Sequence, residues 1–262
     1  MMDSAIFGFV FAGLLVGFIV GMTGVGGGSL MTPILLWFGI NPATAVGTDL
    51  LYAAITKSSG VLVHSKNKNI DWSITGWLAL GSVPAAALTL WFLHNLNSDP
   101  QALNALIKQA LGFVLLLTAL AILFKKQLMA FSSKHAGDHY HLSNRTLNAL
   151  TILTGVILGV MVTLTSIGAG ALGTVALFML YPFLPIRRLV GTEIAHAVPL
   201  TLVAGLGHAG MGSIDWQLLG YLLIGSLPGI YLGSHMTGRV PEHVLRPCLA
   251  VMLTFVGIKL AF

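Results

Sequence analysis

The stretch GMTGVGGGSLMTP (residues 21–33) places five glycines within eight positions, in the middle of a long apolar run. A glycine in a helix interior costs about 1 kcal/mol relative to alanine, so this stretch interrupts a segment whose composition otherwise favours a helix. A break at membrane depth is tolerated only where the freed backbone is buried in protein or lines a polar cavity. Thr32 and Pro33 predict that the helix restarts there, with Thr32 as the N-cap and Pro33 as the first helical residue. Asn41 and Pro42 predict the start of the next helix in the same way.

The composition indicates that most of the chain lies in lipid. Of its 262 residues, 56% are hydrophobic and 8% are charged, and the mean hydropathy is +0.89. A soluble domain carries roughly 25% charged residues, so we expect an all-α polytopic membrane protein that has the lipid bilayer as a partner. The basic residues lie in short loops between apolar runs. Membrane insertion requires that placement, so they do not indicate a nucleic-acid partner.

One long polar stretch, KKQLMAFSSKHAGDHYHLSNR (125–145), divides the chain. We interpret it as a cytoplasmic linker between a first transmembrane repeat (1–124) and a second transmembrane repeat (146–262). The linker contains His135, Asp138, His139 and His141. These residue types could contribute to a metal site, but a solvated loop explains them better, and we expect neither a metal nor a cofactor.

The two halves resemble each other in sequence, in register. Internal repeats of this kind are how many transporters are built, so the pattern predicts a duplicated helical fold. The matched stretches are VGTDL (46–50) with VGTEI (190–194), IDW (70–72) with IDW (214–216) and GSVP (81–84) with GSLP (225–228), all at a shift of 144 residues, and TGVGGG (23–28) with TSIGAG (165–170) at a shift of 142.

The first apolar run of each half, 4–38 and 146–181, is about 35 residues long and would reach about 52 Å as one helix. We therefore expect each run to contain two shorter segments, broken at its glycine cluster, which either cross the membrane twice or are re-entrant. If both runs cross twice, ten Lys and Arg residues fall on the cytoplasmic side. They are Lys66, Lys68, Lys125, Lys126, Lys134, Arg145, Arg187, Arg188, Arg239 and Arg246. The halves would then insert with opposite topology, as two inverted repeats in a bacterial inner membrane.

Ionisable residues inside apolar spans are costly and usually face a pore or a partner. Asp49 and Glu193 occupy matched positions, each after Gly-Thr. Glu193 shares a helix face with His196 at i+3, as Asp49 does with Tyr52. Lys57 lies two turns beyond Asp49. Two interpretations remain open: the acids cap the broken backbone and tie helices together, or they form a polar site between the repeats.

The glycine clusters also allow two interpretations. Small residues let transmembrane helices pack closely, whereas a broken helix directs backbone N–H groups and a positive dipole end toward an anion. The second interpretation predicts an anion site formed by both breaks and the adjacent polar residues. Its predicted substrate-binding residues are Thr23, Gly26, Gly27, Gly28, Ser29, Thr48, Asp49, Lys57, Thr165, Ser166, Gly168, Gly170, Thr192, Glu193 and His196.

Two further pairs of matched residues predict local structure. Asp71 and Asp215 directly precede Trp72 and Trp216, which is typical of a helix N-cap followed by an interfacial anchor. Pro84 and Pro228, each after Gly-Ser, predict matched helix kinks.

The segments GVGGGSLMTPILLWFGINPATAVGTDLLYAAITKSSG (24–60), IDWSITGWLALGSVPAA (70–86) and, in the second half, GTEIAHAV with GSLPGIYLGS resemble the sulfite exporter TauE/SafE family. The resemblance covers nearly the whole chain outside 125–145. It implies transport of small sulfur-containing anions, such as sulfite, thiosulfate or organosulfonates, across the bacterial inner membrane. It also implies functional roles for the glycine loops at 24–28 and 168–170 and for the Gly-Thr-acid motifs at 47–49 and 191–193.

These observations predict a transporter, most simply an exporter, that alternates access at the interface of two repeats. The alternatives are uptake of a different small anion, a membrane-embedded enzyme that uses Asp49 and Glu193 as a carboxylate pair, and a structural or receptor subunit without transport. The sequence gives no nucleophile motif for an enzyme. It is compatible with a homo-oligomer but does not specify one.

Overall fold

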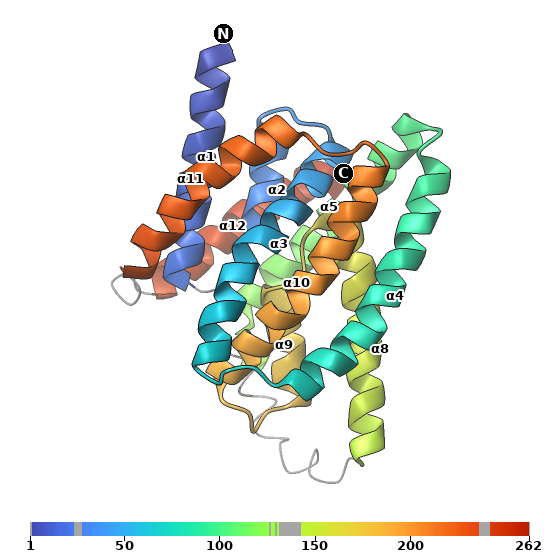
Figure 1. Ribbon diagram of the computed structural model, residues 1–262, viewed down its shortest axis with the longest axis vertical. Helices are drawn as coiled ribbons and strands as arrows, with labels where there is room; N and C mark the ends of the chain where they lie inside the picture. Colours follow the sequence, from blue (N-terminus) through green and yellow to red (C-terminus); the bar gives the residue numbers. More distant parts are fainter. Residues whose placement is uncertain are drawn as a thin grey trace.

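The computed structural model describes residues 2–23, 28–125, 127–128, 130, 143–235 and 242–261. Within these residues the fold is all-helical, with ten principal helices and no strands (Figure 1). The first half contains α1 (Met2–Thr23), α2 (Gly28–Trp37), α3 (Pro42–Lys66), α4 (Trp72–Leu96) and α5 (Pro100–Leu123). The second half contains α8 (Asn144–Thr165), α9 (Ala171–Leu180), α10 (Ile186–Gly210), α11 (Trp216–His235) and α12 (Glu242–Ala261).

Side-chain caps begin several of these helices where the sequence predicts them. The Asn41 side chain accepts a hydrogen bond from the Thr44 N–H, and Pro42 is the first residue of α3. Asp71 accepts from two N–H groups in the first turn of α4, and Asp215 accepts from the Leu218 N–H in α11. The predicted N-caps are therefore confirmed.

The second long run is broken at its glycine cluster, as predicted, between α8 and α9. In the first run α1 ends at Thr23, and residues 24–27 lie outside the described residues. Helix α2 already begins at Gly28, so Pro33 lies inside it and the predicted N-cap at Thr32 is wrong. The physical reason is burial: Leu30 and Met31 pack in the core, and helical backbone over these residues directs both side chains inward. The buried hydroxyl of Thr32 is then used elsewhere.

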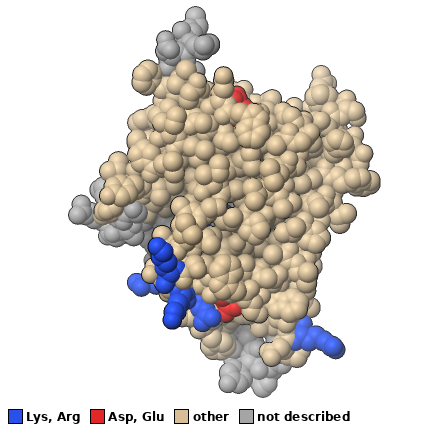
Figure 2. Space-filling model, in the orientation of Figure 1, with Lys and Arg blue, Asp and Glu red and all other residues tan. Residues whose placement is uncertain are grey.

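The short segments α2 and α9 have 10 residues each, which gives a length of about 15 Å against about 30 Å of hydrocarbon. Of the two alternatives, this length favours the re-entrant one. In Figure 1, α8 and α10 both begin at the lower end of the molecule, so the α8–α9 pair returns to the end from which it started. Figure 2 shows Lys and Arg side chains gathered toward this end, where α3 also ends.

The halves interlock through equivalent helix pairs. Helix α1 packs along α11, and its counterpart α8 packs along α4; α3 packs on α10 and α5 on α12. The contact points also match: Gly13 and Gly17 of α1 lie against the backbone of α11, and Gly155 and Gly159 of α8 lie against the backbone of α4. Counterparts such as α1 and α8 run in opposite directions in Figure 1. Small residues allow this close backbone approach, as expected between transmembrane helices.

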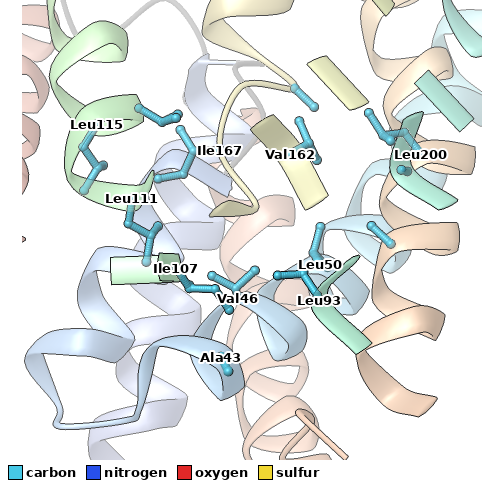
Figure 3. Close-up of a cluster of buried hydrophobic side chains, with 14 of the residues drawn as sticks. Ala43, Val46, Leu50, Leu93, Ile107, Leu111, Leu115, Val162, Ile167 and Leu200 are labelled. Atoms are coloured by element: carbon cyan, nitrogen blue, oxygen red, sulfur yellow. The ribbon is translucent and has the colours of Figure 1, made fainter. Parts of the chain in front are cut away.

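A large apolar cluster joins the two halves at the centre of the bundle (Figure 3). Val46 and Leu50 of α3 meet Ile107 and Leu111 of α5, and Leu200 of α10 completes the cluster from the second half. These side chains fix α3 and α10 side by side. The polar residues of both helices are consequently held inside the protein.

The outer surface is apolar, as a protein in lipid requires. Helices α4, α5, α8 and α10 are long and apolar enough to cross a membrane, judged by length and composition. Large apolar side chains such as Trp91, Phe113 and Phe255 are mostly exposed. Helix α3 is as long as α10 but carries Asp49 and Lys57 on a buried face.

Candidate functional site

The break between α8 and α9 brings an irregular backbone segment into the protein interior. Thr165 closes α8, because its hydroxyl donates to the Met161 carbonyl at 2.6 Å and accepts from the Ile167 N–H at 3.1 Å. Ser166 has a left-handed backbone with φ of 59°. Its hydroxyl is buried and has no hydrogen-bond partner. The segment therefore places an unsatisfied hydroxyl beside the break.

The positive φ angles of Gly168 (120°) and Gly170 (145°) turn this backbone into α9. No side chain caps the first N–H groups of α9. The free N–H groups at the start of a helix attract negative charge. This helix start therefore has the polarity that the prediction of an anion site requires.

Lys57 of α3 reaches this break from the first half of the chain. Its ammonium group donates to the Ala169 carbonyl at 2.6 Å, across 112 residues of sequence, and the side chain is only 6% exposed. Both Asp49 and Glu193 act on this ammonium group electrostatically. Lys57 thus connects the two predicted acids and the second glycine loop.

Asp49 is fully buried and held by the re-entrant segment of its own half. Its Oδ2 accepts a hydrogen bond from the Thr32 hydroxyl at 2.5 Å. The side chain of Ser166 lies near the same carboxylate, but Asp49 Oδ1 and the Ser166 hydroxyl are both without a hydrogen-bond partner. Two polar atoms of this region are consequently buried and available to a ligand.

Glu193 lies against α9, the short helix of the other half, and its carboxylate lacks the hydrogen-bond donor that Asp49 has. An added Cβ on Gly173 of α9 would lie 2.9 Å from Glu193 Cγ and 3.1 Å from Oε1, so the carboxylate covers the first turn of α9. The residue is 1% exposed, and Oε1 has no hydrogen-bond partner. The neighbouring His196 differs: its Nε2 is hydrogen-bonded to the Ser82 hydroxyl of α4 at 2.8 Å.

The two acids lie at different depths in the bundle. Leu51 lies against Gly205 and Ile194 against Gly60, so α3 and α10 run antiparallel, with Glu193 level with about residue 62 of α3. At a rise of 1.5 Å per residue the acids are then about 20 Å apart along the helix axes. A carboxylate dyad requires two acids close enough to share a proton, so this geometry argues against the enzyme alternative. The ammonium-bearing Lys57 lies between them.

The predicted threonines Thr48 and Thr192 contact a different part of the fold. The Thr192 hydroxyl accepts from the Asp71 N–H at 2.9 Å, and the Thr48 hydroxyl accepts from the Asp215 N–H at 3.2 Å. Each threonine therefore supports the start of a helix in the opposite half. Their predicted role in substrate binding remains a prediction.

Several predicted site residues cannot be placed. Gly26, Gly27 and the linker histidines lie outside the described residues, and so do the side chains of Thr23 and Ser29; the backbone of Gly28 begins α2. Among the residues that the structure does describe, no three His, Cys, Asp or Glu side chains come close enough to hold a metal ion.

The structure also brings in residues that the sequence did not suggest. The sequence predicts Thr32 only as a helix cap, and Ser82 only as part of the GSVP stretch that kinks α4. The recurrence of Ser82 as Ser226 at the shift of 144 residues was an available signal. The Ala169 carbonyl carried no signal, because a backbone acceptor has no residue type.

Comparison with known proteins agrees with this architecture. The model of the family described as sulfite exporter TauE/SafE matches residues 9–260. The chain is 42% identical to the probable membrane transporter protein YjnA of Bacillus subtilis (strain 168), over 96% of this chain and 98% of that protein. It is 30% identical to the probable membrane transporter protein YdhB of the same strain, over 95% and 97%.

A probable membrane transporter protein of Methanocaldococcus jannaschii is 27% identical, over 94% of this chain and 92% of that protein. No solved structure matches the chain. The family match covers nearly every residue described above, including both re-entrant segments and all the buried polar residues. The chain therefore belongs to the sulfite exporter TauE/SafE family of membrane transporters.

Proposed function

We propose that this membrane transporter exports small sulfur-containing anions, such as sulfite, thiosulfate or short organosulfonates. The observation that carries the proposal is the contact of Lys57 with the Ala169 carbonyl in the second helix break. This contact holds a buried cation beside free helix N–H groups, a combination suited to an oxyanion. The family description, sulfite exporter, supports the sulfur chemistry.

The substrate binds beside the second helix break, between Lys57 of α3 and the start of α9. Lys57 exchanges its backbone acceptor for an anion oxygen, and N–H groups between Gly168 and Ala171 bind further oxygens. The unpartnered hydroxyl of Ser166 supplies another donor. Several short hydrogen bonds from a preorganised backbone favour a compact anion with oxygens on more than one side.

The halves form an inverted repeat, and access alternates as one repeat rocks against the other. Three observations support this mechanism: counterpart helices run in opposite directions, the helix pairs α1–α11 and α8–α4 are equivalent, and their glycine contacts match. An inverted repeat can adopt two conformations that exchange the roles of its halves, and each opens the site to one side of the membrane.

The protein resides in a bacterial inner membrane, with its basic end in the cytoplasm. The clustering of Lys and Arg toward one end supports this orientation under the positive-inside rule. A membrane potential of 100 mV, negative inside, contributes roughly 2.3 kcal/mol per charge moved. Outward movement of an anion is therefore favourable without another energy source, which makes export the simplest direction.

Efflux from proteoliposomes tests the proposal. Liposomes that contain the purified protein are loaded in turn with sulfite, thiosulfate, sulfate and ethanesulfonate, and a negative-inside potential is imposed. We expect efflux of at least one sulfur anion, faster at higher voltage. Efflux no faster than from protein-free liposomes for all four anions, with folded protein in the membrane, would refute the proposal.

A further inference from the structure

We propose that Glu193 is the proton-binding carboxyl of the transport site and takes up a proton when the anion binds. This inference rests on the proposed function, because it assumes that an anion occupies the site near Lys57. Asp49, the matched acid of the first half, has a different role, because its carboxylate is held by the Thr32 hydroxyl. The two repeats have thus diverged at equivalent positions.

The hydrogen-bond partners of the two acids carry the distinction. Asp49 Oδ2 accepts from the Thr32 hydroxyl, which stabilises an ionised carboxylate. Glu193 Oε1 is buried against the first turn of α9 and has no partner. An ionised carboxylate buried without a donor is much costlier than the protonated form. Of the two acids, Glu193 is therefore the better suited to change its protonation state.

The charge balance gives this proton a function. With Lys57, Asp49 and Glu193 all ionised, the described side chains of the site sum to one negative charge. The start of α9 offsets about half a charge. The remaining negative charge, about half a unit, would repel an entering anion, because the protein interior screens charge poorly. Protonation of Glu193 removes the excess, so the anion and the proton bind more strongly together than separately.

The other groups around Glu193 do not replace it in this role. On α3 these are Lys57 and His64, whose Nδ1 would lie 2.9 Å from an added Cβ on Gly191. At the start of α4, Asp71 contacts Thr192 through its N–H, and its carboxylate is paired with Arg188. On its own helix, His196 is bonded to the Ser82 hydroxyl.

Helix α9 (ALGTVALFML) has no titratable side chain, and those of α4 and α8 lie near helix ends, at His94 and Arg145. Of the two acids, Glu193 is therefore the one that has no hydrogen-bond donor among the described residues.

Proton uptake upon anion binding tests the proposal on the purified full-length protein. The probe is ethanesulfonate or thiosulfate, because both stay fully ionised near neutral pH; for sulfite, protonation of the free anion is subtracted. A pH indicator in weak buffer measures protons taken up per anion bound. We expect uptake approaching about one proton, and a Kd that rises by up to about tenfold per pH unit on the alkaline side.

The variants test the carboxyl of Glu193 itself. Glu193→Gln should remove both the proton uptake and the pH dependence of Kd, whereas Glu193→Asp, which keeps a carboxyl, should retain both. Asp99→Asn is the control and should also retain both, because Asp99 is exposed at the start of α5. Anion binding by the wild type without proton uptake would overturn the proposal, and so would uptake that persists in Glu193→Gln. If Glu193→Gln does not fold, Glu193→Met takes its place with the same expected loss. Absence of anion binding by the wild type would instead contradict the proposed function itself.

Discussion

The close approach of α8 to α4 makes Gly159 sensitive to a single added methyl group. A Cβ at this position would lie 2.5 Å from the Ser82 carbonyl oxygen and 3.0 Å from the Ala85 methyl group, whereas ordinary contacts begin near 3.4 Å. Backbone must therefore move by about 0.9 Å to relieve the closest clash, within a tightly packed pair of helices. Overpacking of this kind typically costs about 1–3 kcal/mol.

Gly76 of α4 is the matched control, since an added Cβ there would have no atom within 4 Å. The Gly76→Ala change should leave the free energy of unfolding unchanged or raise it by up to about 1 kcal/mol through helix propensity. Gly159→Ala should lower it by about 1–3 kcal/mol. The free energy of unfolding of each variant is measured by SDS titration of the purified protein, with tryptophan fluorescence as the signal. Equal stability of the two variants would refute the interlocked packing of α4 and α8.

Three further substitutions test individual contacts by the same titration. Thr32→Val removes the donor to buried Asp49 and should cost about 1–3 kcal/mol; no loss of stability would show that the hydrogen bond does not form. Ser82→Ala leaves His196 Nε2 without its partner and should lower the free energy of unfolding by a similar amount, about 1–3 kcal/mol. An unchanged free energy of unfolding would show that this bond does not form. Arg188→Ala breaks an ion pair in which the arginine is 44% exposed, so we expect less than about 1 kcal/mol, and a larger loss would contradict this surface role.

Much of the architecture could be predicted because it depends on local chemistry. Clustered glycines weaken a helix, and the shift of 142–144 residues transfers each inference from one half to the other. The caps at Asn41 and Asp71 followed from side-chain oxygens placed before a helix. Burial of the two acids followed from the cost of charge in lipid.

The remaining features depend on contacts between distant parts of the chain. The start of α2 at Gly28 is decided by the burial of Leu30 and Met31, which outweighs the capping preference of Thr32. The bond from Lys57 to the Ala169 carbonyl joins residues 112 positions apart. The register of α3 against α10 also separates the two acids, although their matched positions suggested a close pair.

Lys57 carries the proposed anion site, and the natural asymmetry of the repeats at this position supplies the test. Thr201 occupies the equivalent position of the second half, so Lys57→Thr makes the halves alike and removes the buried cation. Lys108→Thr is the control, because Lys108 is exposed on α5. Voltage-driven efflux of the best-transported sulfur anion should fall at least about tenfold in Lys57→Thr, the equivalent of about 1.4 kcal/mol. It should remain at the wild-type rate in Lys108→Thr, and equal rates in the two variants would contradict the assignment of the anion site to Lys57.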